Sequence, residues 1–501
     1  MKSRFRIGYI DDITFGDHWS VVLSNFVTFK AASEKLGLLL NPSKCELFMS
    51  DSDCRLREET LLPFRQQCPD ICETSLENLM ILGSPIGSSA LRRTLTAQLE
   101  TFSFFRKRLS LLHQHDAFFL MKNCLAVPKL LYTFRTAPTF LAPNILKDIE
   151  SCLRASLVEV TNTSLSDARW KQACLPCRDG GLGIPSPIAI ALCAYLASVH
   201  AALPLTARIL GCTDTTPFSH VDEACALWRD MSQAEPPCNP ARQKQWIQPI
   251  ADREWDKLTS DADITTISRL RGCRAPGAGD WLNALPSGNL GLRLNDEQFS
   301  TVIALRLGAP VCSAHTCVCG AEVEQMAQHA FACCKLKSRH ARHRLGNDVL
   351  LRALKSAEAP ATLEPLGLSR CDGKRPDGAT LLAWKGGKPL VWDFTCVHRL
   401  AASYSQKARQ EGATVATAAE GRKREKYNEL SPHCVFQPVA VETLGGLGQD
   451  TSDFLRELGS RICTVSGDRR ATLFLRQRLA IAVQMGNAAC VRESCDRAVS
   501  F

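Results

Sequence analysis

The chain has 501 residues, of which 45% are hydrophobic, so it is long enough for three or four domains with buried cores and is not a disordered chain. Its 60 basic and 51 acidic residues leave a net charge of +9, which permits a polyanionic partner without requiring one. The 24 cysteines come without a secretory signal, so we expect reduced thiols and a metal site in a nuclear or cytoplasmic protein, and exclude a secreted disulfide framework.

The first motif along the chain is an acidic pair at a predicted hairpin tip. Asp11 and Asp12 follow Tyr9-Ile10 and precede the mostly apolar segment 13–15. A polymerase that uses two Mg²⁺ ions needs carboxylates from two separate strands, and this pair supplies one of the two sources. Only ten residues precede the pair, so we expect the second source to be absent from this chain.

Two further motifs follow in order. Residues 35–48 read as a helix, a turn and a strand that contains Lys44, and residues 82–87 form a glycine-rich turn. Together the three motifs resemble the second half of a reverse transcriptase palm of the non-LTR retrotransposon type. The resemblance implies a partial palm over residues 1–90, with Asp11 and Asp12 as magnesium ligands and Lys44 near the incoming nucleotide. It also implies RNA-directed DNA polymerase ancestry without activity, since the fingers and the first catalytic Asp are missing.

The next region is predicted to be helical. Apolar residues recur at three- and four-residue spacing between about 91 and 210, and after a palm such helices imply a thumb, which we assign to residues 91–235. Residues 184–205 are apolar but broken by prolines, which favours a buried helix and no membrane partner. The proline-rich stretch after Ala234 predicts an exposed linker and the main boundary, and we assign residues 236–310 to a linker region.

A second informative pattern is a tight group of cysteines and a histidine within residues 311–336. Cys317, Cys319 and His329 are followed by the adjacent pair Cys333 and Cys334. Thiolates and an imidazole suit Zn²⁺, although buried structural thiols are the alternative. The order resembles the CCHC zinc knuckle that precedes the endonuclease in non-LTR elements with a restriction-like nuclease. The longer spacing from the histidine matches that family better, so Cys334 is the favoured fourth ligand.

Basic residues follow the knuckle. They lie at the start of a predicted helix that runs to about residue 357, and again before the next strand, and are placed to contact a phosphate backbone. A solvated basic helix face is the alternative. The candidate nucleic-acid-binding residues are Arg339, His340, Arg342, His343, Lys374 and Arg375.

The sharpest constellation is a predicted hairpin that carries two aspartates. Asp377 precedes one strand, Gly386-Gly387 marks the turn, and Asp393 lies in the second strand on the face opposite Leu390, Trp392, Phe394 and Cys396. A two-residue turn would put Asp393 opposite Thr380 and turn Asp377 to the other face. A three-residue loop, 385–387, would put both carboxylates on one face about 7 Å apart, so a metal site requires the longer loop or a bulge.

These residues resemble the restriction-endonuclease-like fold, to which we assign residues 337–490. Its signature is a Pro-Asp, an acidic residue on the next strand, and commonly a Lys two positions later. Pro376-Asp377 and Asp393 match, whereas the Lys position holds Thr395. In the retrotransposon branch a Lys on a following helix replaces it.

The remaining candidates come from that resemblance. On the predicted helix after the hairpin, Lys423 is the first choice for the missing cation and Lys426 the second; Glu420, Lys423 and Tyr427 share one face. Glu364 is a candidate upstream acid, with a surface glutamate as the alternative, and Glu442 is a weaker candidate.

The sequence as a whole predicts an α+β multidomain protein: partial palm, helical thumb and linker, small zinc knuckle, and an α/β endonuclease-like domain. The implied activity is Mg²⁺- or Mn²⁺-dependent cleavage of double-stranded DNA, with Zn²⁺ in the knuckle and element RNA as a further partner. A catalytically inactive nucleic-acid-binding remnant of a retroelement is the alternative.

Overall fold

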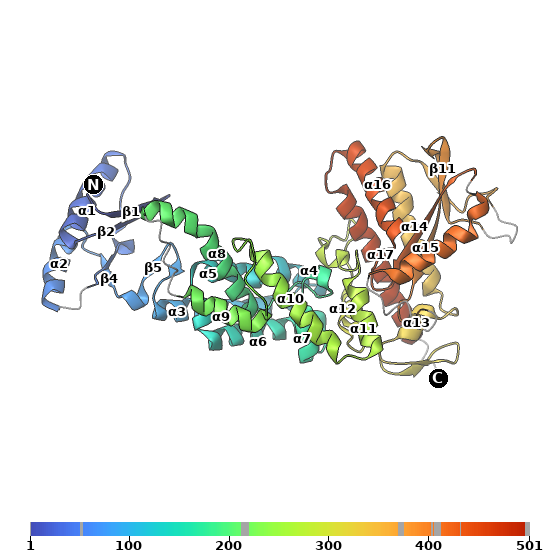
Figure 1. Ribbon diagram of the computed structural model, residues 1–501, viewed down its shortest axis with the longest axis horizontal. Coiled ribbons are helices and arrows are strands. Elements are labelled where there is room, and N and C mark those ends of the chain that lie inside the picture. The colour runs from blue at the N-terminus through green and yellow to red at the C-terminus, as the bar shows by residue number, and fades with distance from the viewer. Residues whose placement is uncertain are drawn as a thin grey trace.

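The computed structural model describes residues 2–50, 54–211, 220–368, 375–401, 404, 412–430 and 432–495. Within these residues the chain is an α+β protein whose successive parts follow one another along a long axis (Figure 1). An N-terminal α/β part stands at one end, helices fill the middle, and a C-terminal part with the largest sheet stands at the other end. The α+β class agrees with the prediction.

The N-terminal part combines short strands with two helices. Its elements are β1 (Phe5–Tyr9), β2 (Asp12–Gly16), α1 (Trp19–Lys35), β3 (Glu46–Phe48), α2 (Cys54–Gln67), β4 (Cys72–Thr74), β5 (Met80–Ile81) and β6 (Ser84–Pro85). The strands pair two by two, and β3 runs parallel to β4. Leu47, Leu61 and Phe64 form a small core beneath them.

The middle of the chain is helical. Its helices are α3 (Ser88–Leu109), α4 (Gln114–Leu120), α5 (Val127–Thr136), α6 (Pro143–Thr161), α7 (Asp167–Cys174), α8 (Pro187–Leu210), α9 (Val221–Ser232), α10 (Gln243–Ser260), α11 (Ile264–Arg274) and α12 (Asp296–Leu307). The ends follow local signals. For example, Asn295 and Gln298 form a capping box before α12, and Gly308 ends it with φ 68°.

The largest hydrophobic core of this helical part extends from Leu91 to Leu307, and a second core joins α8, α9 and α10. The packing therefore differs from the expected linker at 236–310. Trp246 of α10 is buried against Trp228 of α9, with ring centroids 4.8 Å apart, across the irregular stretch that the prolines create. The chain does become irregular there, but its two sides belong to the same packed unit, because aromatic side chains on both sides bury each other.

The most apolar helix is α8. Among the described residues it is the one helix long and apolar enough to cross a membrane, yet half of its most apolar stretch is buried. Leu192, Leu196 and Val199 pack in a core with α9 and α10, whereas Leu205 and Ile209 are exposed. The prediction of a buried helix is confirmed for the first half of α8. Length and apolar composition alone do not distinguish a core helix from a membrane span.

The knuckle region and the C-terminal part follow. Their elements are β7 (His315–Thr316), β8 (Glu322–Val323), α13 (Gln328–Ala332), α14 (Ser338–Ser356), β9 (Ala361–Leu363), β10 (Gly378–Lys385), β11 (Lys388–Val397), α15 (Thr414–Lys426), β12 (Val435–Glu442), α16 (Gln449–Ser466) and α17 (Ala471–Cys495). The four-stranded sheet has the order β12-β11-β10-β9; β11 and β12 are parallel and the other pairs antiparallel.

Helices cover both faces of this sheet. Leu390, Trp392 and Phe394 pack against α14, α16 and α17, as their alternation in the sequence predicts. The other face carries α15, whose Ala416 and Ala419 pack with Ala440 of β12. Since successive residues of a strand face opposite ways, Asp393 of β11 points to the α15 side.

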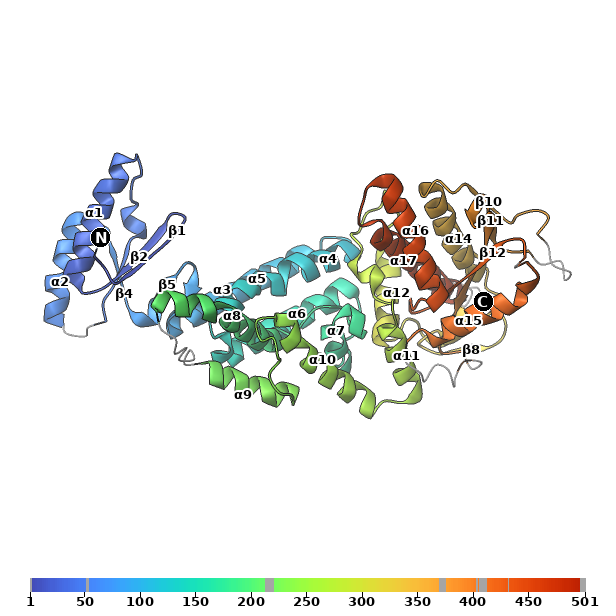
Figure 2. The same cartoon turned by 45° about the horizontal axis from the view of Figure 1, so that its top comes forward.

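The last helix, α17, contributes to three separate cores. Leu475 and Leu479 belong to the core of the C-terminal part, Ile481 to that of the helical part, and Cys490 and Val491 to that of the knuckle region. In Figure 2 this helix lies where the middle and C-terminal parts meet. A single element therefore joins these parts.

Candidate active site and metal centre

The β10–β11 hairpin, whose strands lead to Asp377 and Asp393, contains two irregularities. The turn itself is the two-residue one, Gly386-Gly387, because Lys385 pairs with Lys388, so the three-residue loop is wrong. The register then shifts twice along the hairpin, and Gly378 pairs with Trp392. Just before β10, the Asp377 N–H donates to the Trp392 carbonyl at 3.0 Å, and the Asp377 carboxylate accepts a hydrogen bond from the Phe394 N–H. The hairpin therefore has the irregular register of the bulge alternative, and Asp377 lies next to the segment of β11 that contains Asp393.

Lys423 completes the group from the helix that covers this face. Its Nζ lies 2.5 Å from Asp393 Oδ1, and the Asp393 side chain is 5% exposed against 24% for Lys423. A nearly buried carboxylate needs such a partner, because an unpaired charge in a protein interior is strongly unfavourable. Asp393 and Lys423 therefore form an ion pair between β11 and α15.

His343 and Asn347 of α14 form hydrogen bonds with the Asp377 carboxylate. His343 Nε2 lies 3.0 Å from Asp377 Oδ2, and the same carboxylate oxygen accepts a 2.6 Å hydrogen bond from the Phe394 N–H. Burial opposes ionisation of both groups, but the hydrogen bond and charge of the partner prevail: the pKa of Asp377 is lowered and that of His343 is raised. Asp377 is thus kept ionised by its surroundings.

Two further side chains fix α15 in place. Glu420 is buried and accepts hydrogen bonds from the backbone N–H groups of Asp450 and Thr451 at 3.1 and 2.8 Å, which caps the start of α16. The Tyr427 hydroxyl donates to the Arg375 carbonyl at 3.2 Å, two residues before Asp377. Both residues position the site and neither reaches the aspartates.

The other acidic candidates do not join the pair. Glu442 is fully buried against Arg399, 3.2 Å away, where it forms an internal ion pair. The Glu364 carboxylate is exposed and pairs with Arg375, although its backbone N–H donates to the Asp377 carbonyl at 2.8 Å. Glu364 therefore lies next to the site, with its side chain directed to solvent.

The expected nucleic-acid-binding residues divide into three groups. Arg339 and His340 are exposed at the start of α14. Arg342 is buried, donating to Asn487 Oδ1 at 2.9 Å and to the Phe331 carbonyl, so its assignment to DNA is wrong: the helix turns it inward. His343 contacts Asp377 and Arg375 pairs with Glu364, as described above. Lys374 lies outside the described residues.

A Cys/His group that can bind a metal such as zinc forms in the knuckle region. The ligand atoms of Cys317, Cys319, His329 and Cys333 all lie within 4.8 Å of one another. Cys319 Sγ is 3.1 Å from His329 Nε2, and the sulfur atoms of Cys317 and Cys333 are 3.8 Å apart. A hydrogen bond from the backbone of Ala321 lowers the pKa of the Cys319 thiol, which favours the thiolate that a metal needs.

The fourth member of the group is Cys333, not the favoured Cys334. The Cys333 N–H donates to the His329 carbonyl at 3.0 Å, which holds Cys333 one turn from the histidine at the end of α13. Its extended backbone turns the next side chain the other way, so Cys334 is exposed.

The N-terminal acidic pair lies at the tip of the β1–β2 hairpin, where Tyr9 pairs with Asp12 and Ile10 has a φ of 55°. Asp11 and Asp12 are exposed, and so is Lys44 in a short helical turn before β3. Within the described residues, neither aspartate belongs to a group of three side chains that could share a metal ion.

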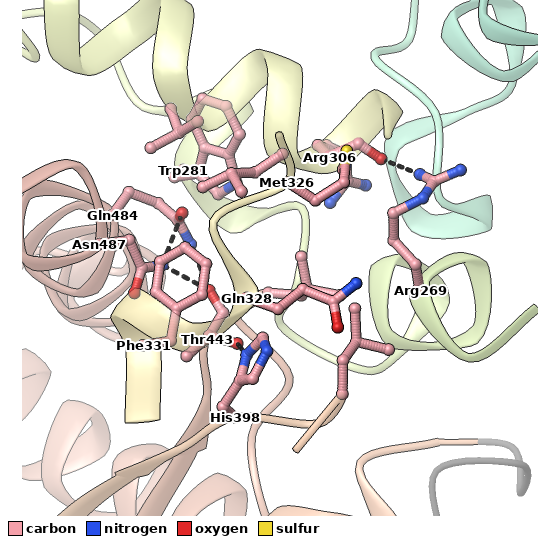
Figure 3. A pocket seen from close by; sticks show the side chains of 14 residues that line it. Arg269, Trp281, Arg306, Met326, Gln328, Phe331, His398, Thr443, Gln484 and Asn487 are labelled. Atoms are coloured by element: carbon pink, nitrogen blue, oxygen red, sulfur yellow. Dashed lines mark hydrogen bonds between the residues drawn. The ribbon is translucent and has the colours of Figure 1, made fainter. Parts of the chain in front are cut away.

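A small cavity lies apart from these sites, where the helical part, the knuckle region and the C-terminal part meet (Figure 3). Its volume is ≈ 30 Å³, room for about one or two waters. His398 Nδ1 lies 3.0 Å from Thr443 Oγ1, and Asn487 Nδ2 donates to the Thr443 carbonyl at 2.6 Å. Burial lowers the pKa of His398 to about 3. The cavity is a packing junction between the three parts.

No protein-family model matches this chain, and no curated protein matches it.

Proposed function

We propose that this chain is a retroelement-derived protein whose C-terminal part cleaves double-stranded DNA with the help of a divalent cation, and whose N-terminal part derives from a reverse transcriptase palm. The observation that carries the endonuclease proposal is the position of Lys423, 2.5 Å from Asp393, with Asp377 just before the neighbouring strand. An acid after Pro376, an acid on the next strand and a Lys from the following helix form the combination that the sequence resemblance implies.

The donor atoms fit a hard cation. Asp377 and Asp393 offer carboxylate oxygens, which Mg²⁺ and Mn²⁺ prefer, and the lowered pKa of Asp377 keeps that donor ionised. Such a cation would supply positive charge to the phosphate group that is cut.

The residues of the chain account for the rest of the chemistry. In hydrolysis a bond forms from a water oxygen to phosphorus, the bond from phosphorus to one sugar oxygen breaks, and the water proton passes to solvent or to the leaving oxygen. The Lys423 ammonium group is placed to stabilise the extra negative charge on the phosphate oxygens. His343 holds Asp377, and Tyr427 holds the backbone two residues before it, so both are positioning residues.

Exposed basic residues lie close to this group. Arg339 and His340 precede His343, which contacts Asp377, by about one helical turn on α14, and being exposed they can contact a DNA backbone. Such contacts supply affinity independently of sequence and weaken as salt rises.

The decisive test replaces one carboxylate while the fold is kept. Purified wild-type protein is expected to nick a DNA duplex in Mg²⁺ or Mn²⁺, and Asp393→Asn is expected to bind the duplex within about threefold of wild type while cleaving at least about 100-fold more slowly. Gel assays of cleavage and fluorescence anisotropy of binding measure the two effects. Asp453→Ala, an exposed aspartate on α16, is the matched control and should cleave normally.

The same assay separates the two lysines. Lys423→Ala should lose cleavage by at least about 100-fold, because its ammonium group lies at Asp393. Lys426→Ala should lose less than about tenfold, because its Nζ lies over the Tyr427 ring, 4.8 Å from the centroid. Cleavage by Asp393→Asn at the wild-type rate would place the site elsewhere. Duplex binding by wild type with no nicking in either cation would establish the inactive binding remnant instead.

A further inference from the structure

Three side chains outside the knuckle ligand set converge at the end of the last helix. Cys312 and His315 lie just before the knuckle, with His315 opening β7, and Cys495 is the last residue of α17. Although Cys495 is far from the other two in sequence, the ligand atoms of all three lie within 4.8 Å of one another. All three residues are half-buried, so the group is neither an exposed cluster nor part of a sealed core.

One nitrogen of the His315 imidazole is held by the backbone and the other is free to bind a ligand. Nδ1 lies 2.9 Å from the Ser313 carbonyl, which can only accept a hydrogen bond, so Nδ1 is the donor in this contact. Nε2 is buried and has no hydrogen-bond partner among the described residues. A backbone carbonyl that fixes the histidine tautomer from one side while the other nitrogen binds a metal is a recurring feature of metal sites.

The surroundings of the Cys312 and Cys495 sulfur atoms also favour metal binding. Cys312 Sγ is 3.5 Å from the nearest carbonyl, that of Glu324, which is a weak contact for a sulfur atom. Burial raises the pKa of the Cys312 thiol to about 11, and the neighbouring Cys495 sulfur adds to the shift, since the two sulfurs lie close together. A cation at this position would also lie at the C-terminal end of α17, where the helix dipole favours positive charge.

We propose that Cys312, His315 and Cys495 form a second metal site, which binds Zn²⁺ through two thiolates and one imidazole and ties the end of α17 to the knuckle region. In a tetrahedral site with zinc-to-sulfur bonds of about 2.3 Å, ligand atoms are about 3.5–3.8 Å apart. The ligand atoms already lie within 4.8 Å of one another, so small side-chain rotations bring them to that spacing. Three protein ligands leave the fourth position to water. The two zinc groups share no residue, and this proposal does not depend on the nuclease activity.

The test measures zinc per chain in the full-length protein. Wild type purified with a mild reductant is expected to hold about two Zn²⁺, whereas His315→Ala and Cys495→Ser should each hold about one. His329→Ala, which disrupts the knuckle group, should also hold about one, and the double variant His315→Ala/His329→Ala none. Cys463→Ser, a half-buried cysteine of α16 outside both groups, is the matched control and should keep both ions.

A second measurement does not depend on how the variants fold. In the wild-type protein, iodoacetamide should label Cys495 at least about tenfold more slowly before zinc is chelated than afterwards, because a metal-bound thiolate is shielded from alkylation. Equal labelling rates together with a zinc content that Cys495→Ser leaves unchanged would overturn the second site. A Cys312–Cys495 disulfide in protein purified with reductant would overturn it as well. If only the knuckle group fails to bind zinc, His329→Ala will leave the zinc content per chain unchanged.

Discussion

His115 shows what a single buried histidine contributes to the helical part. Its ring stacks on Phe299 with centroids 4.9 Å apart, and its Nδ1 accepts a 3.2 Å hydrogen bond from the Leu294 N–H. Burial lowers the pKa of His115 from its usual 6.5 to about 4, with Arg293 adding to the effect. The folded protein therefore keeps this ring neutral at pH values where the unfolded chain protonates it.

This difference makes stability pH-dependent. Between about pH 6.5 and pH 4 the unfolded state binds one proton more than the folded state at this ring, so acidification lowers the free energy of unfolding by about 1.4 kcal/mol per pH unit. His115→Gln has no such proton, so urea unfolding followed by tryptophan fluorescence should lose less stability between pH 7 and pH 5 than wild type does. His433 is exposed and provides the control: His433→Gln should lose as much stability as wild type. Equal losses of stability in all three proteins would show that His115 does not cause the pH dependence.

The sequence predicted only some of the residues of the candidate site. The alternation around Asp393 predicted its face, and resemblance directed attention to Lys423, which the structure places beside it. Arg342 was wrongly expected to bind DNA because exposed and buried positions alternate within one turn of α14. The sequence alone did not show which face of α14 meets α17. The role of Asn347, which holds the Trp392 ring nitrogen at 2.9 Å, left no sequence signal, because it depends on the approach of α14 to β11.

At the scale of elements, α14 approaches β11 closely because of a glycine. A Cβ added at Gly346 would lie 2.4 Å from the Phe394 ring, well inside van der Waals contact. Gly346→Ala should therefore destabilise the C-terminal part by about 1–3 kcal/mol, seen as a lower midpoint in thermal unfolding. Gly421→Ala is the matched control on α15: nothing lies within 4 Å, so alanine should be neutral or stabilise by up to about 1 kcal/mol. Equal midpoints for the two variants would contradict this account.

The β10–β11 hairpin marks a limit of sequence-based prediction at this scale. The glycines identified the turn, but the bulges depend on local hydrogen bonds. The Thr380 hydroxyl accepts from the Leu390 N–H at 2.9 Å and donates to the Leu382 carbonyl at 2.7 Å, so a side chain satisfies ladder groups where the register shifts. The sequence does not show that a threonine in a strand will form such hydrogen bonds with the backbone.

At the scale of the molecule, the exposed acidic pair in the N-terminal part leads to a prediction about nucleotide transfer. Asp11 and Asp12 sit on a two-stranded sheet, and within the described residues they join no third ligand side chain. We expect no template-dependent primer extension by the 501-residue protein in Mg²⁺ or Mn²⁺, because two-metal catalysis needs carboxylates from a second strand. A primed template with labelled nucleotides tests this, with an active reverse transcriptase as positive control. Extension that Asp11→Asn abolishes would show that the carboxylate set is complete.

Domain boundaries were the least predictable property at this scale. The prolines near residue 240 do interrupt the helices, but a boundary depends on which side chains bury each other across the break. Here Trp228 and Trp246 do so. Long-range burial of this kind comes from the folded arrangement, and local composition does not encode it.

The course of α17 has a consequence for cooperativity. Because this one helix supplies side chains to the cores of the helical part, the knuckle region and the C-terminal part, none of the three can lose its structure without exposing apolar surface in the others. The three parts therefore behave thermodynamically as one unit that spans most of the chain, while the N-terminal strands and helices, which have their own small core, are free to melt separately.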